Sequence, residues 1–371
     1  MTMSFTDEQQ ELRHLVRRFL EEKSSPERVR ERIDAGAVRD DAVWRQMAEQ
    51  LGLQGLAIPE EYGGAGFGPV ELGIVLEEMG RRLYVGPYFS TVALVGQLLT
   101  EVDDEAARET WLPSIADGSL TAALAVTEDA GSWDPATFAT RGEPAGDGWR
   151  VSGAKSFVVD AVSSGLLVVA AVAPDGLGFF GVDGGAPGVA ITDLDGLDLT
   201  RGLARVEMRE APAIRIAPGA DGARLLERVH DLAVVALASE QAGGAARALE
   251  TAVEYAKIRE QFGRPIGSFQ AIKHKCADML LKVESARSAA YYAASVVAGG
   301  GPEARVAAAL AKSYCSEAFT HVAKENIQVH GGIGYTWEHD AHLYLKRAKS
   351  AEVLFGSPVE HRARLATLIG I

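Results

Sequence analysis

The chain has 371 residues, of which 47% are apolar and 24% charged, which is enough to bury several cores in two or three domains. Its 51 acidic and 37 basic side chains give a net charge of −14, which argues against a general nucleic-acid or anionic-membrane surface. The opening residues are polar and acidic and the longest apolar run, 166–173, cannot span a bilayer, so we expect a cytoplasmic protein without a membrane partner.

Residues 1–118 are predicted to form an N-terminal helical domain. Thr6 is a good helix N-cap with Gln9 three residues later, and the apolar side chains that follow recur at helical spacing. The same periodicity predicts further helices at 41–53, 69–83 and 91–99.

Residues 119–222 no longer follow the helical pattern and are predicted to form a middle β domain. Short runs rich in Val, Leu and Phe alternate with turn pairs such as Asp147-Gly148. The predicted strands lie within 119–128, 149–159, 166–173, 176–182 and 189–194. Because no helices separate these strands, they indicate an antiparallel sheet or barrel rather than a doubly wound fold.

Residues 223–371 return to the helical period and are predicted to form a C-terminal helical bundle. Three long helical segments are expected, at 246–262, 268–283 and 304–332. On the second, apolar residues at helical spacing predict one buried stripe: Phe269, Ile272, Cys276, Met279 and Val283. The two cysteines of the chain, Cys276 and Cys315, have no metal-ligand spacing and are expected to be buried thiols.

Three weaker patterns are not expected to mark a binding or catalytic site. The glycines at 63–68 follow a predicted helix and do not match a dinucleotide loop, so a surface turn is expected. His339 and His342 lack a third ligand at metal spacing, so we expect no metal site. Ser132 and Ser239 lack a nucleophile elbow, so hydrolysis has little support.

The strongest signal is a set of segments in fixed order: LGLQGLAIPEEYGGAG (51–66), AVTEDAGS (125–132), REQFGRPIGSFQAIKHKCADM (259–279) and QVHGGIGYTWE (328–338). Together they resemble the acyl-CoA dehydrogenase family over essentially the whole chain. The resemblance implies an α+β fold with an N-terminal helical domain, a central antiparallel sheet or barrel and a C-terminal four-helix bundle.

The resemblance also implies a chemistry. Members of this family bind FAD and dehydrogenate an acyl-CoA thioester between its α and β carbons. A base removes the α-proton while flavin N5 accepts the β-hydride. The electrons then pass to an acceptor such as electron-transfer flavoprotein. Each FAD lies across a subunit interface, so the candidate residues fall into two sets.

The first set matches positions that contact the FAD of a neighbouring chain: Arg259, Phe262, Gln270, Gln328, Gly331 and Gly332. A guanidinium suits the pyrophosphate because its donors form a fork that matches phosphate oxygens. The paired glycines let the backbone approach the cofactor without a Cβ clash. All six positions match, which predicts that this chain supplies its half of the neighbour's FAD site intact; we call these six residues the half-site.

The second set would hold this chain's own flavin and substrate, and it departs from the family pattern. Thr127 and Ser132 match the loop beside the substrate, and Asp231 matches a position that often contacts CoA. However, Phe157 and Val159 stand where the family has Trp and Thr, and the loop containing Thr127 is one residue shorter. A valine methyl cannot replace the hydrogen-bond donor that the threonine supplies near flavin N5.

The catalytic glutamate of the family is replaced by Phe355. Some members place the base at the start of the first bundle helix instead, and that position is Ala233 here. Asp231 is the nearest carboxylate, but two positions along a helix is about 200° around it, so it should point away. General base catalysis is worth about 10²–10⁴-fold, so we expect no catalytic residue and little activity from this chain alone.

The resulting interpretation is a non-catalytic subunit of a heteromeric acyl-CoA dehydrogenase, which completes the FAD site of a catalytic partner subunit, in a heterotetramer. In this the chain resembles subunits of actinobacterial enzymes that act on CoA esters of steroid side chains. Two alternatives stay open. One is a self-sufficient homomeric flavoenzyme with a relocated base, at Asp231 or Glu227, or with a chemistry that needs none. The other is a flavin-free structural or binding protein.

Overall fold

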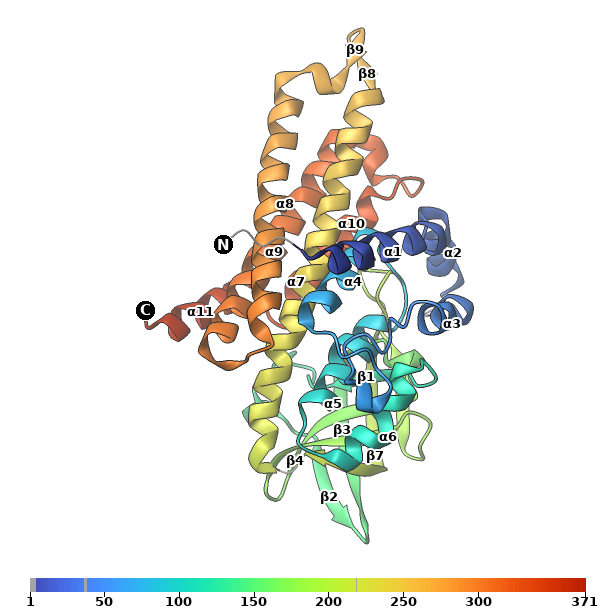
Figure 1. Cartoon of the computed structure of the whole chain (residues 1–371), viewed down its shortest axis with the longest axis vertical. Coiled ribbons are helices and arrows are strands. Elements are labelled where there is room, and N and C mark those ends of the chain that lie inside the picture. The colour runs from blue at the N-terminus through green and yellow to red at the C-terminus, as the bar shows by residue number, and fades with distance from the viewer. Residues whose placement is uncertain (1–4, 37–38, 218) are drawn as a thin grey trace.

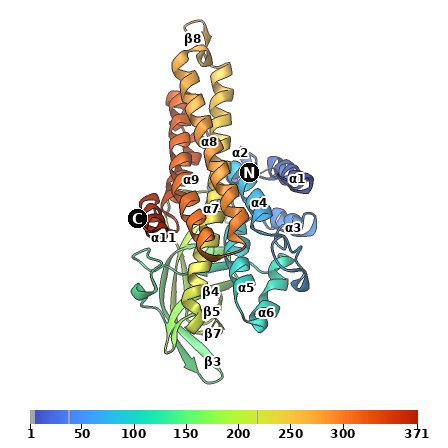
Figure 2. The ribbon, with the colours of Figure 1, turned by 60° about the vertical axis from the view of Figure 1, so that its left-hand side comes forward.

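The computed structural model describes residues 5–36, 39–217 and 219–371, and its helices, β domain and long helical bundle follow one another along the chain (Figure 1). The bundle runs along the long axis of the molecule. The β domain lies at one end of the bundle and the N-terminal helices lie along its side (Figure 2). The predicted α+β architecture is confirmed.

The N-terminal helices are α1 (Asp7–Lys23), α2 (Pro26–Ala35), α3 (Asp41–Glu49), α4 (Pro69–Arg81), α5 (Gln97–Glu101) and α6 (Glu105–Ala116). The predicted N-cap of α1 is confirmed, because Thr6 Oγ1 accepts from the Gln9 N–H at 3.2 Å and Gln9 Oε1 accepts from the Thr6 N–H at 3.0 Å. The regular helix predicted at 91–99 is wrong in type, because a π-helix, η2 (Phe89–Gly96), precedes α5. The Thr91 hydroxyl of η2 bonds both backbone groups of Ala122, at 2.9 and 3.2 Å, which fixes this segment against the first strand.

The strands of the β domain are β1 (Ala122–Ala125), β2 (Arg141–Ala145), β3 (Gly148–Val159), β4 (Leu166–Ala173), β5 (Gly176–Asp183), β6 (Val189–Asp193) and β7 (Leu203–Ala217). Their order is β1-β4-β2-β3-β7-β5, with β6 on β7, and a further pairing of β4 with β5 closes the sheet. The predicted antiparallel sheet or barrel is confirmed in most of its pairings, but β1 runs parallel to β4, with Ala122 opposite Leu166. A parallel pair cannot be joined by a hairpin, and here the chain passes through β2 and β3 between the two strands.

The bundle consists of α7 (Gly219–Ile258), α8 (Gln270–Val297), α9 (Gly301–His330), α10 (Ala341–Val353) and α11 (Pro358–Ile369). A small hairpin, β8 (Glu260–Gln261) and β9 (Arg264–Pro265), joins α7 to α8 at the tip of the bundle (Figure 1). A short 3-10 helix, η6 (Gly331–Tyr335), follows α9. Helix α9 packs against α7, α8, α10 and α11 and is thus the centre of the bundle.

The predicted apolar stripe on α8 is only partly buried. Met279 and Val283 are buried, whereas Phe269, Ile272 and Cys276 are half-buried. The first turns of α8 extend to the tip, beyond the ends of most other helices, and this explains the difference (Figure 1).

Three apolar clusters hold the parts together. The first joins the N-terminal helices and one side of the β domain to the bundle, the second lies in the bundle toward its tip, and the third fills the closed sheet. Of the two cysteines, Cys315 is buried as predicted, but Cys276 is not fully buried. Among the described residues, no helix is both long and apolar enough to cross a membrane.

Candidate functional site

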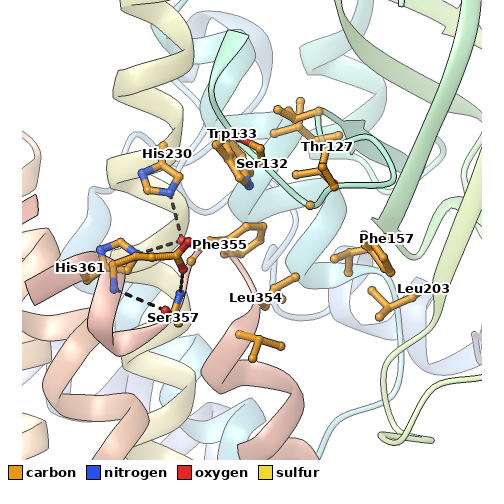
Figure 3. A pocket seen from close by; sticks show the side chains of 18 of the residues that line it. Thr127, Ser132, Trp133, Phe157, Leu203, His230, Leu354, Phe355, Ser357 and His361 are labelled. Carbon is orange, nitrogen blue, oxygen red and sulfur yellow. Dashed lines mark hydrogen bonds between the residues drawn. The ribbon is translucent and has the colours of Figure 1, made fainter. Parts of the chain in front are cut away.

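A pocket of about 590 Å³ lies where the β domain meets the lower end of the bundle (Figure 3). Its apolar lining residues are Leu94, Leu124, Val126, Ala130, Trp133, Phe157, Val159, Leu203, Val353, Leu354 and Phe355. Its polar lining residues are Thr127, Ser132, His230, Ser350, Ser357, Glu360, His361 and Arg364. An apolar cavity of this size with a few convergent polar groups is typical of a small-molecule site.

The turn between α10 and α11 forms one wall of the pocket, and Phe355 is its central residue. Phe355 has a left-handed backbone, with φ of 60°, which side chains rarely adopt because Cβ crowds the backbone. Two imidazoles hold this conformation: Nε2 of His230, at 3.0 Å, and Nε2 of His361, at 2.9 Å, both donate to the Phe355 carbonyl oxygen (Figure 3). The turn is therefore fixed by side chains from α7 and α11.

Both imidazoles are neutral at pH 7. Burial lowers the pKa of His230 to about 3 and the pKa of His361 to about 4. Because each Nε2 uses its proton on the carbonyl of Phe355, each Nδ1 is an acceptor. Nδ1 of His230 lies 3.3 Å from Arg364 Nη1, whereas Nδ1 of His361 is buried and has no hydrogen-bond partner in the described part of the chain.

The ring of Phe355 packs as a core residue. Phe355 is 7% exposed, and its ring stacks on that of Phe89 with a centroid distance of 6.0 Å. Trp133 meets it edge-on at 5.6 Å. The ring presents no polar group to the cavity, but the cavity beside it stays open.

The loop after β1 forms the opposite wall, and it is pinned by a carboxylate. Glu128 accepts hydrogen bonds from the backbone N–H of Ala139 and Thr140, and it pairs with the buried Lys155 at 3.1 Å. Burial alone would raise the pKa of Glu128, but these bonds lower it to about 2. This network holds Thr127 and Ser132, two predicted substrate residues, on the pocket wall.

The strand that faces a flavin ring in the family is β3, and here it offers no side-chain donor to the pocket. Val159 is buried and lines the cavity. Phe157 is 44% exposed, lines the same cavity and has a left-handed φ of 59°.

The carboxylates proposed as relocated bases do not line this pocket. Asp231 is buried and does not line the cavity itself, but it forms an ion pair at 2.7 Å with Arg364, which does line it. Glu227 pairs with Arg305 at 3.4 Å near the surface. Burial raises the pKa of Asp231, and Arg364 opposes this shift. Asp231 therefore lies one ion pair away from the cavity, and its role in substrate binding stays a prediction.

One carboxylate of the pocket was not among the predicted residues. Glu360 lines the cavity and accepts the N–H of Ser357 at 2.6 Å, as the capping box of α11. This backbone hydrogen bond lowers the pKa of Glu360. The sequence signal for its position was the Ser-Pro-x-Glu capping pattern at 357–360.

The residues predicted to face a neighbouring chain lie elsewhere, toward the tip of the bundle. Arg259 and Phe262 belong to the β8–β9 hairpin, Gln270 begins α8, and Gln328 and the following glycines end α9 (Figure 1). All six are exposed, and Phe262 is 92% exposed. Within the described residues, the Arg259 side chain has no hydrogen bond or ion pair.

An aromatic contact brings these segments together. The ring of Tyr255, one turn before the end of α7, stacks on His330 at the end of α9 with a centroid distance of 4.3 Å. The hairpin residue Arg259 and the glycine turn that starts at Gly331 therefore share one end of the bundle. His339 and His342 also lie near this end, and among the described residues no cluster of three or more ligating side chains could hold a metal.

Comparisons with known proteins agree with this architecture. The N-terminal domain model of acyl-CoA dehydrogenases matches residues 6–119, and the C-terminal domain model matches residues 220–368. Acyl-CoA dehydrogenase IpdE2 of Mycobacterium tuberculosis is 35% identical over 363 residues, which cover 98% of each chain.

Two similar solved structures contain paired chains. A chain of the Tcur3481-Tcur3483 steroid ACAD has a TM-score of 0.89 and 32% identity, with 98% of each chain covered. A chain of the ChsE4-ChsE5 complex from Mycobacterium tuberculosis has a TM-score of 0.90 and 29% identity, with 100% of this chain and 99% of that chain covered. The fold, the matched domains and these relatives lead to one conclusion: the chain belongs to the acyl-CoA dehydrogenase family.

Proposed function

We propose that this chain is the non-catalytic subunit of a heteromeric, FAD-dependent acyl-CoA dehydrogenase. The observation that carries the proposal is the contrast between its two sites. The position of the catalytic base holds Phe355, whose ring is packed between Phe89 and Trp133. The residues for a neighbour's cofactor are all present and exposed.

The other titratable groups of the pocket are weak bases. Glu360 is bound to a backbone N–H, and its lowered pKa makes it a weaker base than an ordinary glutamate. His230 and His361 are weak bases, because burial lowers their pKa to about 3 and about 4. Ala233, at the second family position for a base, is fully buried and carries no proton acceptor.

The tip of the bundle fits a neighbour's FAD. A Cβ at Gly331 or Gly332 would meet no atom of this chain within 4 Å, so the backbone there is open to another molecule. The Arg259 guanidinium is exposed, and pyrophosphate oxygens are its natural partners. The bound FAD would accept the hydride in the partner's active site, while this chain holds the cofactor in place.

The proposed substrate is an acyl-CoA thioester, and specifically a CoA ester of a steroid side chain. This narrower class is supported by the similar chain of an enzyme described as a steroid ACAD. The catalytic partner chain, in a heterotetramer, and an electron acceptor such as electron-transfer flavoprotein complete the proposed system.

Flavin stoichiometry tests the proposal. The chain is co-expressed and co-purified with a candidate partner, the product of any adjacent dehydrogenase gene, and flavin absorbance is compared with the protein concentration. We expect one FAD per pair of unlike chains, because only one of the two sites in each pair can seat a flavin. One FAD per chain would contradict the proposal.

A second candidate is a homomeric flavoenzyme that uses Glu360. It is favoured by one observation, the open pocket of about 590 Å³ that this carboxylate lines. In that case the chain purified alone would be yellow and would reduce a dye in the presence of an acyl-CoA, and Glu360→Gln would abolish this reaction. A chain that binds no flavin even beside its partner would instead be a structural or binding protein.

A further inference from the structure

The loop that joins α9 to α10, residues 331–340, is held by an arginine of the N-terminal helices. Arg30 on α2 donates from Nε to Asp340 Oδ1 at 2.8 Å, and its Nη1 donates to the carbonyl oxygen of Trp337. The guanidinium also lies 5.8 Å from the centroid of the Trp337 ring. A planar fork suits this double contact, because a lysine has a single nitrogen to share between the two partners.

Two ring contacts link this loop to the cofactor half-site. His339 lies in the loop, and its ring packs 4.2 Å from that of His330. His330 directly precedes Gly331 and stacks on Tyr255 at 4.3 Å. Tyr255 is one helical turn before Arg259. The contacts of Arg30 therefore lie at the same end of the bundle as Arg259 and the glycine turn that starts at Gly331.

The loop exposes groups that the packing of this chain does not use. Tyr335 is 68% exposed. A Cβ at Gly331 or Gly332 would meet nothing within 4 Å, whereas a Cβ at Gly334 would lie 3.1 Å from the Cβ of His330. Gly334 is needed because of close packing, and Gly331, with a φ of 64°, is needed for the backbone turn. The open space beside Gly331 and Gly332 leaves their backbone available to a second molecule.

We propose that Arg30 is a positioning residue, which fixes the loop 331–340 so that its backbone meets the FAD of the neighbouring subunit. This inference rests on the proposed function, because the neighbour-facing half-site is what Arg30 positions. The attachment of α2 itself does not depend on Arg30: Val29 is 4% exposed and belongs to the same apolar cluster as Leu343 and Tyr344 of α10. Loss of the guanidinium should loosen the loop and leave α2 in place.

The test measures FAD binding by the flavin-loaded assembly that the chain forms. In Arg30→Met we expect FAD to dissociate with a constant raised about tenfold, the order expected for losing one charged hydrogen-bonded pair. Arg30→Lys keeps the charge but not the fork, so it should restore only part of this loss. Arg28→Met, an exposed arginine on the same helix, is the matched control and should bind FAD as the unchanged protein does.

The outcomes separate this inference from the proposed function. An FAD constant that stays within about twofold in Arg30→Met, or an equal loss in Arg28→Met, overturns the inference. If Arg30→Met prevents assembly, Asp340→Asn is measured instead, because it removes the ion pair and keeps the size of the side chain. Unchanged FAD binding in Asp340→Asn also overturns the inference. Arg259→Ala is measured in parallel. If it weakens FAD binding while the Arg30 variants do not, the proposed function stands and the positioning role fails; if none of them matters, the half-site itself is wrong.

Discussion

Phe355 combines a strained backbone with a buried apolar ring. A non-glycine residue at a φ of 60° costs about 1–3 kcal/mol unless its surroundings hold it there. Here two imidazoles donate to its carbonyl and two aromatic rings enclose its side chain. Phe355 is thus part of the core in this chain.

Restoring a carboxylate at this position should not restore catalysis. Phe355→Glu would bury a charge between Phe89 and Trp133, which costs several kcal/mol or forces the group to protonate, and it would remove ring packing worth about 3–5 kcal/mol. Val159 would still offer no donor to a flavin. We expect no turnover when this variant is combined with a partner whose own base is replaced by glutamine. Substantial dehydrogenation of acyl-CoA in that complex would show that the pocket lacked only its base.

Arg259 should matter for cofactor retention and not for folding. Its side chain is exposed and makes no contact that stabilises the chain, so Arg259→Ala should leave the thermal midpoint of the isolated chain unchanged. In the complex it should weaken FAD binding by about one to two orders of magnitude, because a charged hydrogen bond to pyrophosphate is lost. Lys257→Ala, an exposed cation on the same helix end, serves as the control. Unchanged FAD content in Arg259→Ala would contradict the assignment.

His361 should make the folded chain sensitive to acid. Its pKa is about 4 in the folded chain, below the ordinary value of 6.5, chiefly because of burial. The unfolded chain therefore binds the proton first, so the stability contribution is complete above pH 6.5 and is lost as the pH falls toward 4. The slope from this group is at most about 1.4 kcal/mol per pH unit.

A glutamine at this position separates the titration from the hydrogen bond. His361→Gln keeps an N–H donor for the Phe355 carbonyl but cannot be protonated in this range. Urea unfolding measured between pH 4 and 7 should show a shallower dependence on pH in this variant. His14→Gln, at an exposed position on α1, should keep the original slope. Equal slopes in all three proteins would exclude His361 as the cause.

At the scale of elements, the end of α10 depends on a buried lysine. Lys312 on α9 is fully buried, and its Nζ donates to the carbonyl oxygens of Ala351, at 2.9 Å, and Glu352, at 3.1 Å. Burial lowers the pKa of Lys312 to about 7. These bonds satisfy two of the carbonyls that a helix end leaves free, two to three residues before the turn at Leu354.

Lys312→Met should loosen this turn. The loss of the two carbonyl bonds should destabilise the chain by about 1–3 kcal/mol, partly offset by burial of the methionine. The local effect is more diagnostic: the amide protons of Leu354 and Gly356 should exchange faster with solvent. Lys324→Met, exposed on the same helix, should change neither quantity. Unaltered exchange at the turn in Lys312→Met would mean that the lysine does not cap α10.

Sequence periodicity predicts those elements whose neighbours are local. The N-cap at Thr6 and the strand at 166–173 follow from a few adjacent residues, and both are confirmed. Strand β7 was missed, because Arg205 and Glu207 interrupt the apolar run; yet they alternate with buried Ala204, Val206 and Met208, and that period of two was the available signal.

The site was predictable in part for the same reason. A family motif identifies positions such as Phe355 and Arg259 one at a time. It does not reveal which distant side chains meet there. The two imidazoles on the Phe355 carbonyl come from α7 and α11. These helices lie far apart in the sequence, so no local pattern pairs the two residues. Arg30 and Asp340, which lie 310 positions apart, are a second such pair.

At the scale of the whole molecule, the pocket beside Phe355 and the proposed neighbour-facing half-site are separate. The pocket lies at the junction with the β domain, and the half-site lies toward the tip of the bundle (Figure 1). Ligand linkage should therefore depend on assembly. Added FAD should raise the thermal midpoint of the complex, since FAD at about 100 times its dissociation constant adds about 2.7 kcal/mol to stability. Under the proposed function the isolated chain should show no such shift, because its tip would supply only half of a cofactor site. A comparable shift in the isolated chain would indicate a complete flavin site within it.

The exposed tip also bears on the synthesis of the proposed heteromer. Phe262, between β8 and β9, is 92% exposed, Ile258 at the end of α7 is 77% exposed, and Tyr335 at the end of η6 is 68% exposed. Exposed apolar surface marks interaction sites, and it promotes self-association when it is left bare. We therefore expect balanced synthesis of the two subunits to be a requirement: surplus copies of this chain should aggregate or be degraded, so that the amount of partner sets how much of it persists in the cell.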